Sequence, residues 1–209
     1  DCMKVQQSGY TQSRGYLFSL TSTHTISVFT AYCDMDTAGG GWLVFQRRKD
    51  GSVDFDRVWS KYAQGFGLLR TEFWLGKQFH ALMRVTNPVW GMQPPNTDWK
   101  QHHSLAVQAY NTGVISLNYV ISGVSLIGNS LTYSSGMMFS TRDSDNDNNT
   151  RRFCSQQFGG AWWFKNCHMS NLNGKYYLSP ETTPYANGVS WFTFSGNRSS
   201  LQYSDMKLR

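Results

Sequence analysis

The sequence predicts a mixed fold in which short β-strands are combined with short helices. Residues 24–36 alternate apolar and polar side chains, and residues 39–51 place a second strand-like run after three glycines. The period changes across residues 59–84, where Phe79, Leu82 and Met83 follow a helical spacing that glycines interrupt. We therefore expect short helices between groups of strands.

A hairpin and a long irregular segment are predicted in the second half of the chain. Residues 104–110 and 114–121 alternate again and are separated by Asn111-Thr112-Gly113, a typical hairpin signal. After about residue 133, regular periodicity disappears for most of the remaining chain. Long irregular segments in compact domains usually carry function, so we expect the functional site there.

The charge balance is basic, with 19 Lys and Arg residues against 13 Asp and Glu, a formal net charge of +6. The densest basic run is Arg47-Arg48-Lys49, and no long block of lysine and arginine exists. This scatter argues against nucleic acid as a partner. Attraction to acidic glycans or anionic cell surfaces remains compatible with the charge.

The four cysteines fall into an early pair and a late pair, for which three connectivities exist. Zinc-type Cys-x-x-Cys spacing is absent from the sequence, which favours two disulfide bonds over a metal site or free thiols. Disulfides, together with glycosylation sequons at Asn148 and Asn197, indicate a secreted protein. The start at Asp1 without signal peptide or membrane span is what we expect of a mature secreted chain, and we expect no membrane insertion.

An acidic segment, "STRDSDNDNNTRRFC" at residues 140–154, places Asp143, Asp145 and Asp147 on alternate positions. Like charges so close repel each other unless a cation lies among them, so calcium is favoured over a solvated acidic turn. An EF-hand is excluded, since its glycine and glutamate positions hold Asn148 and Cys154.

Several long motifs resemble the fibrinogen C-terminal-like domain. They are "YCDMDTAGGGWLVFQRRKDGSVDFDRVWSKYAQGFG" at 32–67, "EFWLG" at 72–76, "FSTRDSDND" at 139–147 and "GAWWFKNCHMSNLNGKYY" at 160–177. The resemblance extends from Cys2 to the final "MKLR", and residues 87–104 match least.

The resemblance implies an α+β fold and a single domain over residues 1–209. Its parts are a small N-terminal subdomain (roughly 1–35), a central twisted antiparallel sheet with short helices (36–138), and a loop-rich calcium and ligand subdomain (139–209). It also implies disulfides between Cys2 and Cys33 and between Cys154 and Cys167, and a cis peptide between Asn166 and Cys167.

The resemblance further implies a structural calcium ion. Its ligands are the carboxylates of Asp145 and Asp147 and backbone carbonyls near Asn149 and Arg151. Asp143 then lies behind these ligands without touching the ion. The loop after Asp147 is one residue longer than in similar sequences, so the carbonyl of Thr150 is an alternative to that of Arg151.

Lectins of this family, such as ficolins and tachylectins, bind acetyl groups beside the calcium. The resemblance places that pocket at Phe158, Asn166, Cys167, His168, Tyr185 and Ala186. Aromatic walls can bury a methyl group, while backbone N–H groups and a tyrosine hydroxyl bind the acetyl oxygen. Arg151 and Arg152 are candidate partners for the carboxylate of sialic acid. The alternative is that they are two solvated arginines.

We therefore expect a secreted lectin of innate recognition that binds acetylated glycans such as GlcNAc, GalNAc or sialic acid on cell or microbial surfaces. Multivalency would come from homo-oligomers. The alternative is a protein-interaction or receptor-binding module. A fibrin-type peptide site is disfavoured because Phe158 and Ala186 replace its carboxylates. The sequence contains no HExxH, GxSxG or glycine-rich phosphate motif, so we expect no enzyme.

Overall fold

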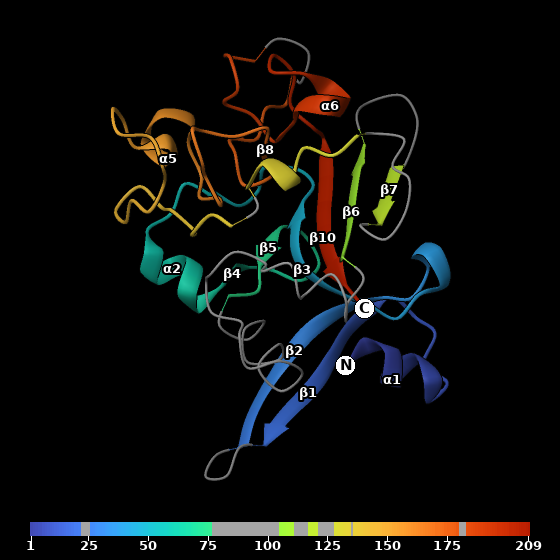
Figure 1. The fold of residues 1–209 in the computed structure, drawn as a ribbon. Coiled ribbons are helices and arrows are strands. Elements are labelled where there is room, and N and C mark those ends of the chain that lie inside the picture. Colours follow the sequence, from blue (N-terminus) through green and yellow to red (C-terminus); the bar gives the residue numbers. More distant parts are fainter. Residues whose placement is uncertain (22–25, 77–104, 111–116, 121–127, 135, 180–182) are drawn as a thin grey trace.

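The computed structural model of the protein describes residues 1–21, 26–76, 105–110, 117–120, 128–134, 136–179 and 183–209 (Figure 1). An antiparallel sheet runs through the molecule. Loops and short helices gather at one end of it, around α5 and α6, whereas α1 and the β1–β2 hairpin extend at the opposite end. The irregular C-terminal part thus lies apart from the N-terminal hairpin.

The main sheet follows the strand order β1-β2-β3-β10-β6-β7, with antiparallel neighbours throughout. These strands are β1 (Arg14–Thr21), β2 (Ile26–Asp34), β3 (Trp42–Arg48), β10 (Tyr203–Leu208), β6 (Leu105–Tyr110) and β7 (Leu117–Val120). The short strands β4 (Phe66–Gly67) and β5 (Phe73–Trp74) pair with each other, and β5 also pairs with β3. The strands and the antiparallel sheet predicted from the sequence are confirmed.

The helices are short, as the α+β prediction requires. They are α1 (Cys2–Gln7), α2 (Trp59–Gln64), α5 (Cys154–Phe158) and α6 (Phe192–Ser195), with 3-10 turns at Thr37–Gly39 and Thr132–Ser134. Among the described residues, no helix has the length and apolar character needed to cross a bilayer. The predicted helical residues Phe79, Leu82 and Met83, the turn at 111–113 and the segment 87–104 lie outside the described residues.

The N-terminal helix is fixed at both of its ends. Asp1 accepts a hydrogen bond from the backbone N–H of Lys4, which is the usual role of an N-cap aspartate. A disulfide bond joins Cys2 on α1 to Cys33 on β2, with 5.6 Å between their Cα atoms. The first predicted disulfide is therefore present.

The last strand, β10, lies in the middle of the sheet between β3 and β6. Periodicity does not reveal this strand, because "YSDMKL" alternates apolar residues with charged residues that are also buried. Lys207 Nζ lies 2.6 Å from Asp34 Oδ2 and 3.5 Å from Asp205 Oδ1, and all three residues are buried. The end of the chain thus belongs to the central sheet, and the proposed subdomain boundaries stay a prediction.

Aromatic side chains form the core between the sheet and the irregular loops. Tyr62 on α2 packs against Trp74 and Phe139, with ring centroids 5.3 and 5.2 Å apart. Trp163 lies 5.1 Å from Phe139 on the loop side of this cluster. Buried aromatic pairs of this kind contribute roughly 0.5–1.5 kcal/mol each beyond their buried area.

A buried ion pair connects the sheet to these loops. Glu72 is fully buried, and its carboxylate accepts hydrogen bonds from the N–H groups of Lys49 and Val53 at 2.7 and 3.0 Å. Arg48 Nε lies 3.5 Å from the same carboxylate. The Arg48 Nη1 donates to the carbonyls of Leu172 and Gly174, so that β3 positions the loop that follows β8 (Ser170–Asn171).

We expect Glu72→Ala to lower the free energy of unfolding by about 3–5 kcal/mol, because Arg48 stays buried without its carboxylate. The matched control is Asp56→Ala, since Asp56 pairs with Arg142 at 3.6 Å while both side chains are about half exposed. That change should cost less than about 1 kcal/mol. Urea denaturation of both variants measures the difference, and equal losses would contradict the assigned role of Glu72.

Candidate functional site

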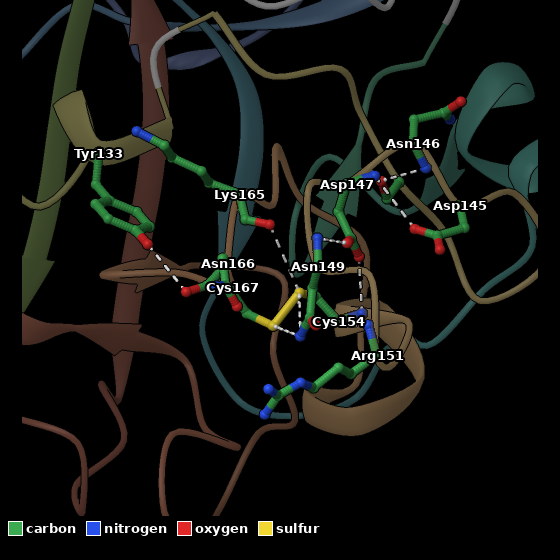
Figure 2. The surroundings of a disulfide bond; sticks show 11 residues. Tyr133, Asp145, Asn146, Asp147, Asn149, Arg151, Cys154, Lys165, Asn166 and Cys167 are labelled. Atoms are coloured by element: carbon green, nitrogen blue, oxygen red, sulfur yellow. Dashed lines mark hydrogen bonds between the residues drawn. A yellow bond between two sulfur atoms is a disulfide. The ribbon is translucent and has the colours of Figure 1, made fainter.

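The acidic loop is wound by its own side chains. Asp145 Oδ1 accepts a hydrogen bond from the Asp147 N–H at 3.2 Å, and Asp147 Oδ1 accepts one from the Asn149 N–H at 2.7 Å (Figure 2). Asn149 Oδ1 in turn accepts a hydrogen bond from the Arg151 N–H at 3.1 Å. Each bond spans two residues and is an Asx-turn. The alternate spacing in the sequence therefore produces consecutive turns that curl the loop.

Two of the three aspartates lie together, and the third does not. Asp143 Oδ1 accepts hydrogen bonds from the Trp59 N–H and the Thr141 hydroxyl, so it caps the start of α2. Asp147 also accepts from the N–H of Cys154 through its Oδ2, at 2.8 Å. Burial and the neighbouring Asp145 carboxylate raise the pKa of Asp147 above its usual value.

The oxygen atoms of this loop suit a hard cation. The Asp145 and Asp147 carboxylates face the same turn, and within the described chain the carbonyls of Asn149, Thr150 and Arg151 accept no hydrogen bond. Carboxylate and carbonyl oxygens are the ligands that calcium takes in proteins. The described residues contain no cluster of three or more His, Cys, Asp or Glu side chains that could hold a metal. In the part of the chain that the structure describes, the candidate calcium ligands are therefore these two carboxylates and the loop carbonyls.

The loop is docked onto the segment that follows Lys165. A disulfide joins Cys154 to Cys167, with 5.5 Å between the Cα atoms, which confirms the second predicted bond. Asn149 Nδ2 lies 3.4 Å from Cys167 Sγ (Figure 2), and the Asn148 N–H donates to the Lys165 carbonyl at 3.0 Å. The Asn166–Cys167 peptide is cis, as the resemblance implies.

An apolar wall stands directly after this cis peptide. The His168 ring packs edge-on against Phe158, with centroids 5.0 Å apart, and lies 5.6 Å from the Phe164 ring. Burial lowers the pKa of His168 to about 4, an effect that the nearby Ala186 backbone partly opposes. Among the described residues neither ring nitrogen reaches hydrogen-bond geometry with a partner, and with the lowered pKa the imidazole is an uncharged part of the wall at neutral pH.

Tyr185 and Ala186 complete the group of predicted pocket residues. Ala186 has a positive φ of 57°, and its N–H donates to the Asn197 carbonyl at 2.7 Å. Asn197 Nδ2 donates to the Tyr185 hydroxyl at 3.1 Å, while the Tyr185 side chain is 58% exposed. Phe164, which contacts His168, and Asn197, which contacts Tyr185, are not among the predicted pocket residues, and only the sequon marked Asn197.

Glycine is required where two site loops cross. Gly160, directly after α5, has a φ of +70°, and a Cβ there would lie 2.1 Å from the Asn173 carbonyl oxygen. Close backbone approach of this kind excludes any other residue without a shift of one loop. The same crossing is closed by Asn173 Nδ2, which donates to the Ala161 carbonyl at 2.9 Å.

The site also contains backbone donors without protein partners. Within residues 136–179, the N–H groups of Cys167 and His168 donate no hydrogen bond to the protein. Tyr133 donates its hydroxyl to the Asn166 carbonyl at 3.0 Å (Figure 2). The His168 N–H belongs to the residue whose ring packs against Phe158, and the Cys167 N–H comes directly before it in the chain.

The two arginines proposed for carboxylate recognition are exposed. Arg151 extends away from Asp145 and Asp147 in Figure 2. Within the described part of the chain, neither Arg151 nor Arg152 forms an ion pair.

Known proteins share this chain's sequence and architecture. The family model for the C-terminal globular domain of fibrinogen beta and gamma chains matches residues 1–209. Fibrinogen C domain-containing protein 1 of Mus musculus is 40% identical over 218 residues, which cover 100% of this chain and 46% of that protein. The chain spans about half the length of the curated relatives it matches.

Solved structures agree with the sequence comparison. The fibrinogen-like globe domain of human ANGPTL2 has a TM-score of 0.82 at 30% identity, covering 100% of this chain and 97% of that one. The lamprey fibrin D-dimer, in complex with the peptide ligand Gly-His-Arg-Pro-amide, has a TM-score of 0.77 at 28% identity and covers 100% and 72%. The chain belongs to the family of fibrinogen C-terminal globular domains.

Proposed function

We propose that this domain is a secreted, non-enzymatic lectin module that binds N-acetylated glycans at the His168 wall. The observation that carries the proposal is a pair of adjacent N–H groups, on Cys167 and His168, that donate to no acceptor among the described residues and belong to the segment of an uncharged aromatic wall. An acetyl group needs both features, a donor pair for its oxygen and an apolar surface for its methyl group.

Tyr185 supplies the third feature of the proposed site. Its hydroxyl oxygen accepts from Asn197 Nδ2, so the hydroxyl proton is available to a ligand oxygen. The Tyr185 side chain is 58% exposed, so the end of a glycan chain can reach its hydroxyl from solvent. Because single sugar sites bind weakly, useful avidity requires several copies, and we propose homo-oligomers for that reason.

Calcium is proposed to organise the site without contacting the sugar. Asp145 and Asp147 would hold the ion, together with carbonyls between Asn149 and Arg151. The ion would neutralise the charges of these two carboxylates. Asn149 and the Cys154–Cys167 disulfide then fix the loop against the cis peptide that presents the two N–H groups.

A second candidate function is peptide or receptor binding. It is favoured by the structural match to the lamprey fibrin D-dimer, whose described complex contains a cationic peptide. At the site itself, Phe158 and Ala186 provide no carboxylate for such a peptide, and His168 is uncharged at neutral pH. A protein partner would therefore use another surface, and binding of acetylated sugars separates the two candidates.

Removing calcium and making the Asp145→Ala/Asp147→Ala double change should each lower both the thermal stability and the sugar binding. Saturating calcium at about 100 times its dissociation constant stabilises a domain by about 2.7 kcal/mol, which corresponds to roughly 5–10 °C in Tm for this size. We expect the wild type to lose that increment with chelator, and the double variant to show none. Calorimetry with parallel binding to immobilised N-acetylglucosamine measures both effects. Retained sugar binding by the calcium-free double variant would refute the proposed role.

Acetylated monosaccharides should compete for the site, and glucose or galactose should not. His168→Ala removes the wall and should abolish binding, while Tyr185→Phe removes one donor and should weaken it about 2- to 10-fold. Tyr10→Phe is the matched control, because Tyr10 is similarly exposed at 55% but is not part of the site. Titration calorimetry measures this competition. If galactose competes as well as N-acetylgalactosamine, the acetyl site is not at the His168 wall.

Sialic acid should gain affinity from the exposed arginines. The change Arg151→Gln/Arg152→Gln should weaken binding of N-acetylneuraminic acid up to about fivefold per charge, and leave N-acetylglucosamine unaffected. The methyl ester of the acid should already bind like the double variant. The control is Lys61→Gln/Lys175→Gln, which removes the same charge elsewhere. If the ester binds as well as the acid at low salt, these arginines do not select the ligand.

A further inference from the structure

The basic run Arg47-Arg48-Lys49 is divided between the two faces of β3. Successive side chains of a strand point to opposite faces, so Arg48 reaches the loop at Leu172 while Arg47 faces the other way. The Arg47 guanidinium stacks on the Tyr32 ring, 4.2 Å from its centroid. This face of the sheet plays no part in the proposed lectin site, and Arg47 lines a cavity there.

That cavity, called the basic cavity below, has a volume of about 850 Å³. Ligand pockets typically measure ~300–1,000 Å³. Its described lining consists of Ser13, Arg14, Gly15, Tyr32, Arg47, Lys49, Leu69, Arg70 and Tyr203. Four of these nine residues are cations and none is acidic, so the hollow presents positive charge to solvent.

Strand pairing brings these cations together from distant parts of the sequence. Arg14 begins β1, where the next residue, Gly15, lies opposite Tyr32 on β2. Arg47 lies opposite Phe73 on β5 and opposite Asp205 on β10. The basic cavity therefore forms where the N-terminal hairpin meets the main sheet, on backbone that regular pairing holds in place.

Arg47 is the buried centre of the cavity wall and is incompletely satisfied. Its side chain is buried, with a residue exposure of 7%, and Nη1 donates to the Leu69 carbonyl at the long distance of 3.3 Å. Its Nε has no hydrogen-bond partner among the described residues, while the Tyr203 hydroxyl lies within reach of the same guanidinium. Buried guanidinium groups normally have partners for their donors, so an unmatched donor at a cavity wall indicates a missing acceptor.

The nearby carboxylates of Asp205 and Asp34 both face Lys207, although Asp205 Oδ1 has no hydrogen-bond partner among the described residues. Asp205 accepts from the Tyr203 hydroxyl at 2.9 Å and lies 3.5 Å from Lys207, which also pairs with Asp34. These two carboxylates balance Arg47 and Lys207. The exposed cations of the rim, Arg14, Lys49 and Arg70, then outweigh Asp36, which accepts a hydrogen bond from Ser13 at the edge.

We propose that the basic cavity binds a sulfated glycan chain, with one anionic group at Arg47 and further sulfates along the rim cations. Sulfate esters keep their charge at physiological pH, and a guanidinium fork binds such oxygens in two parallel hydrogen bonds. Three exposed cations around an open hollow suit an extended polymer with repeated charges. The net charge of +6 attracts such a polyanion at long range.

The test is the binding of a size-fractionated heparin oligosaccharide to the whole chain, measured by calorimetry over a range of sodium chloride concentrations. The variant Arg14→Gln/Lys49→Gln/Arg70→Gln should lose about tenfold in affinity at physiological salt, because each exposed charge pair contributes of order two- to fivefold. Its affinity should also depend less steeply on salt, since fewer counterions are exchanged.

The matched control is Lys4→Gln/Lys61→Gln/Lys175→Gln, which removes three exposed charges from residues that do not line the basic cavity. This control should bind heparin within about twofold of the wild type. All three cavity changes are at exposed residues, and thermal unfolding checks that both variants fold. Equal losses in the two variants would overturn the proposal, because the binding would then follow net charge alone.

Two further measurements separate this cavity from the lectin site and from other polyanions. Excess N-acetylglucosamine or a calcium chelator should leave heparin binding unchanged, so the proposal stands or falls independently of the proposed lectin function. Displacement of heparin by N-acetylglucosamine would overturn it. Tighter binding of poly-glutamate than of heparin would also overturn it, in favour of an acidic peptide as the ligand.

Discussion

The buried contact between Arg48 and Glu72 is the constraint on which the arrangement of the irregular loops depends. Glu72 accepts a hydrogen bond from the Lys49 N–H, directly after β3, and pairs with Arg48. Arg48 Nη1 donates to the carbonyls of Leu172 and Gly174. Burial lowers the pKa of Arg48 and the Glu72 charge opposes that effect. A charge buried so completely needs its partners in place, so the sheet and the loops of the ligand site can only be assembled together.

The same strand serves two separate surfaces because a strand alternates its side chains. Arg48 is directed to the C-terminal loops and Arg47 to the opposite face, where it stacks on the Tyr32 ring and its Nε has no hydrogen-bond partner in the described part of the chain. A one-residue slip of β3 would exchange the two arginines and place each in the other's surroundings. The pairing of β3 with both β2 and β10 prevents such a slip, which is how a common antiparallel sheet supports two proposed sites.

The family motifs imply the disulfides and the cis peptide that the structure contains, and periodicity in the sequence predicts the strands β2, β3, β6 and β7. It failed for β10, since Asp205 and Lys207 are buried as an ion cluster with Asp34 and hide the apolar alternation of Met206 and Leu208. Contacts such as that of Asn197 with Tyr185 also escaped prediction. Such contacts depend on the tertiary packing of two irregular segments, which no local sequence pattern predicts.

The acidic loop shows why spacing alone supports two interpretations. Alternate aspartates are what a cation requires, yet the same spacing builds Asx-turns that curl the loop without an ion. Asp143 satisfies the spacing and nevertheless caps α2, which lies outside the turn. Asp145 and Asp147 differ from Asp143 in position, because both belong to the turn, where Asp147 accepts from the Cys154 N–H. Asn149 of the same turn contacts the disulfide that precedes His168. A proposed ion there would influence the wall through this fixed chain of contacts, without reaching a ligand itself.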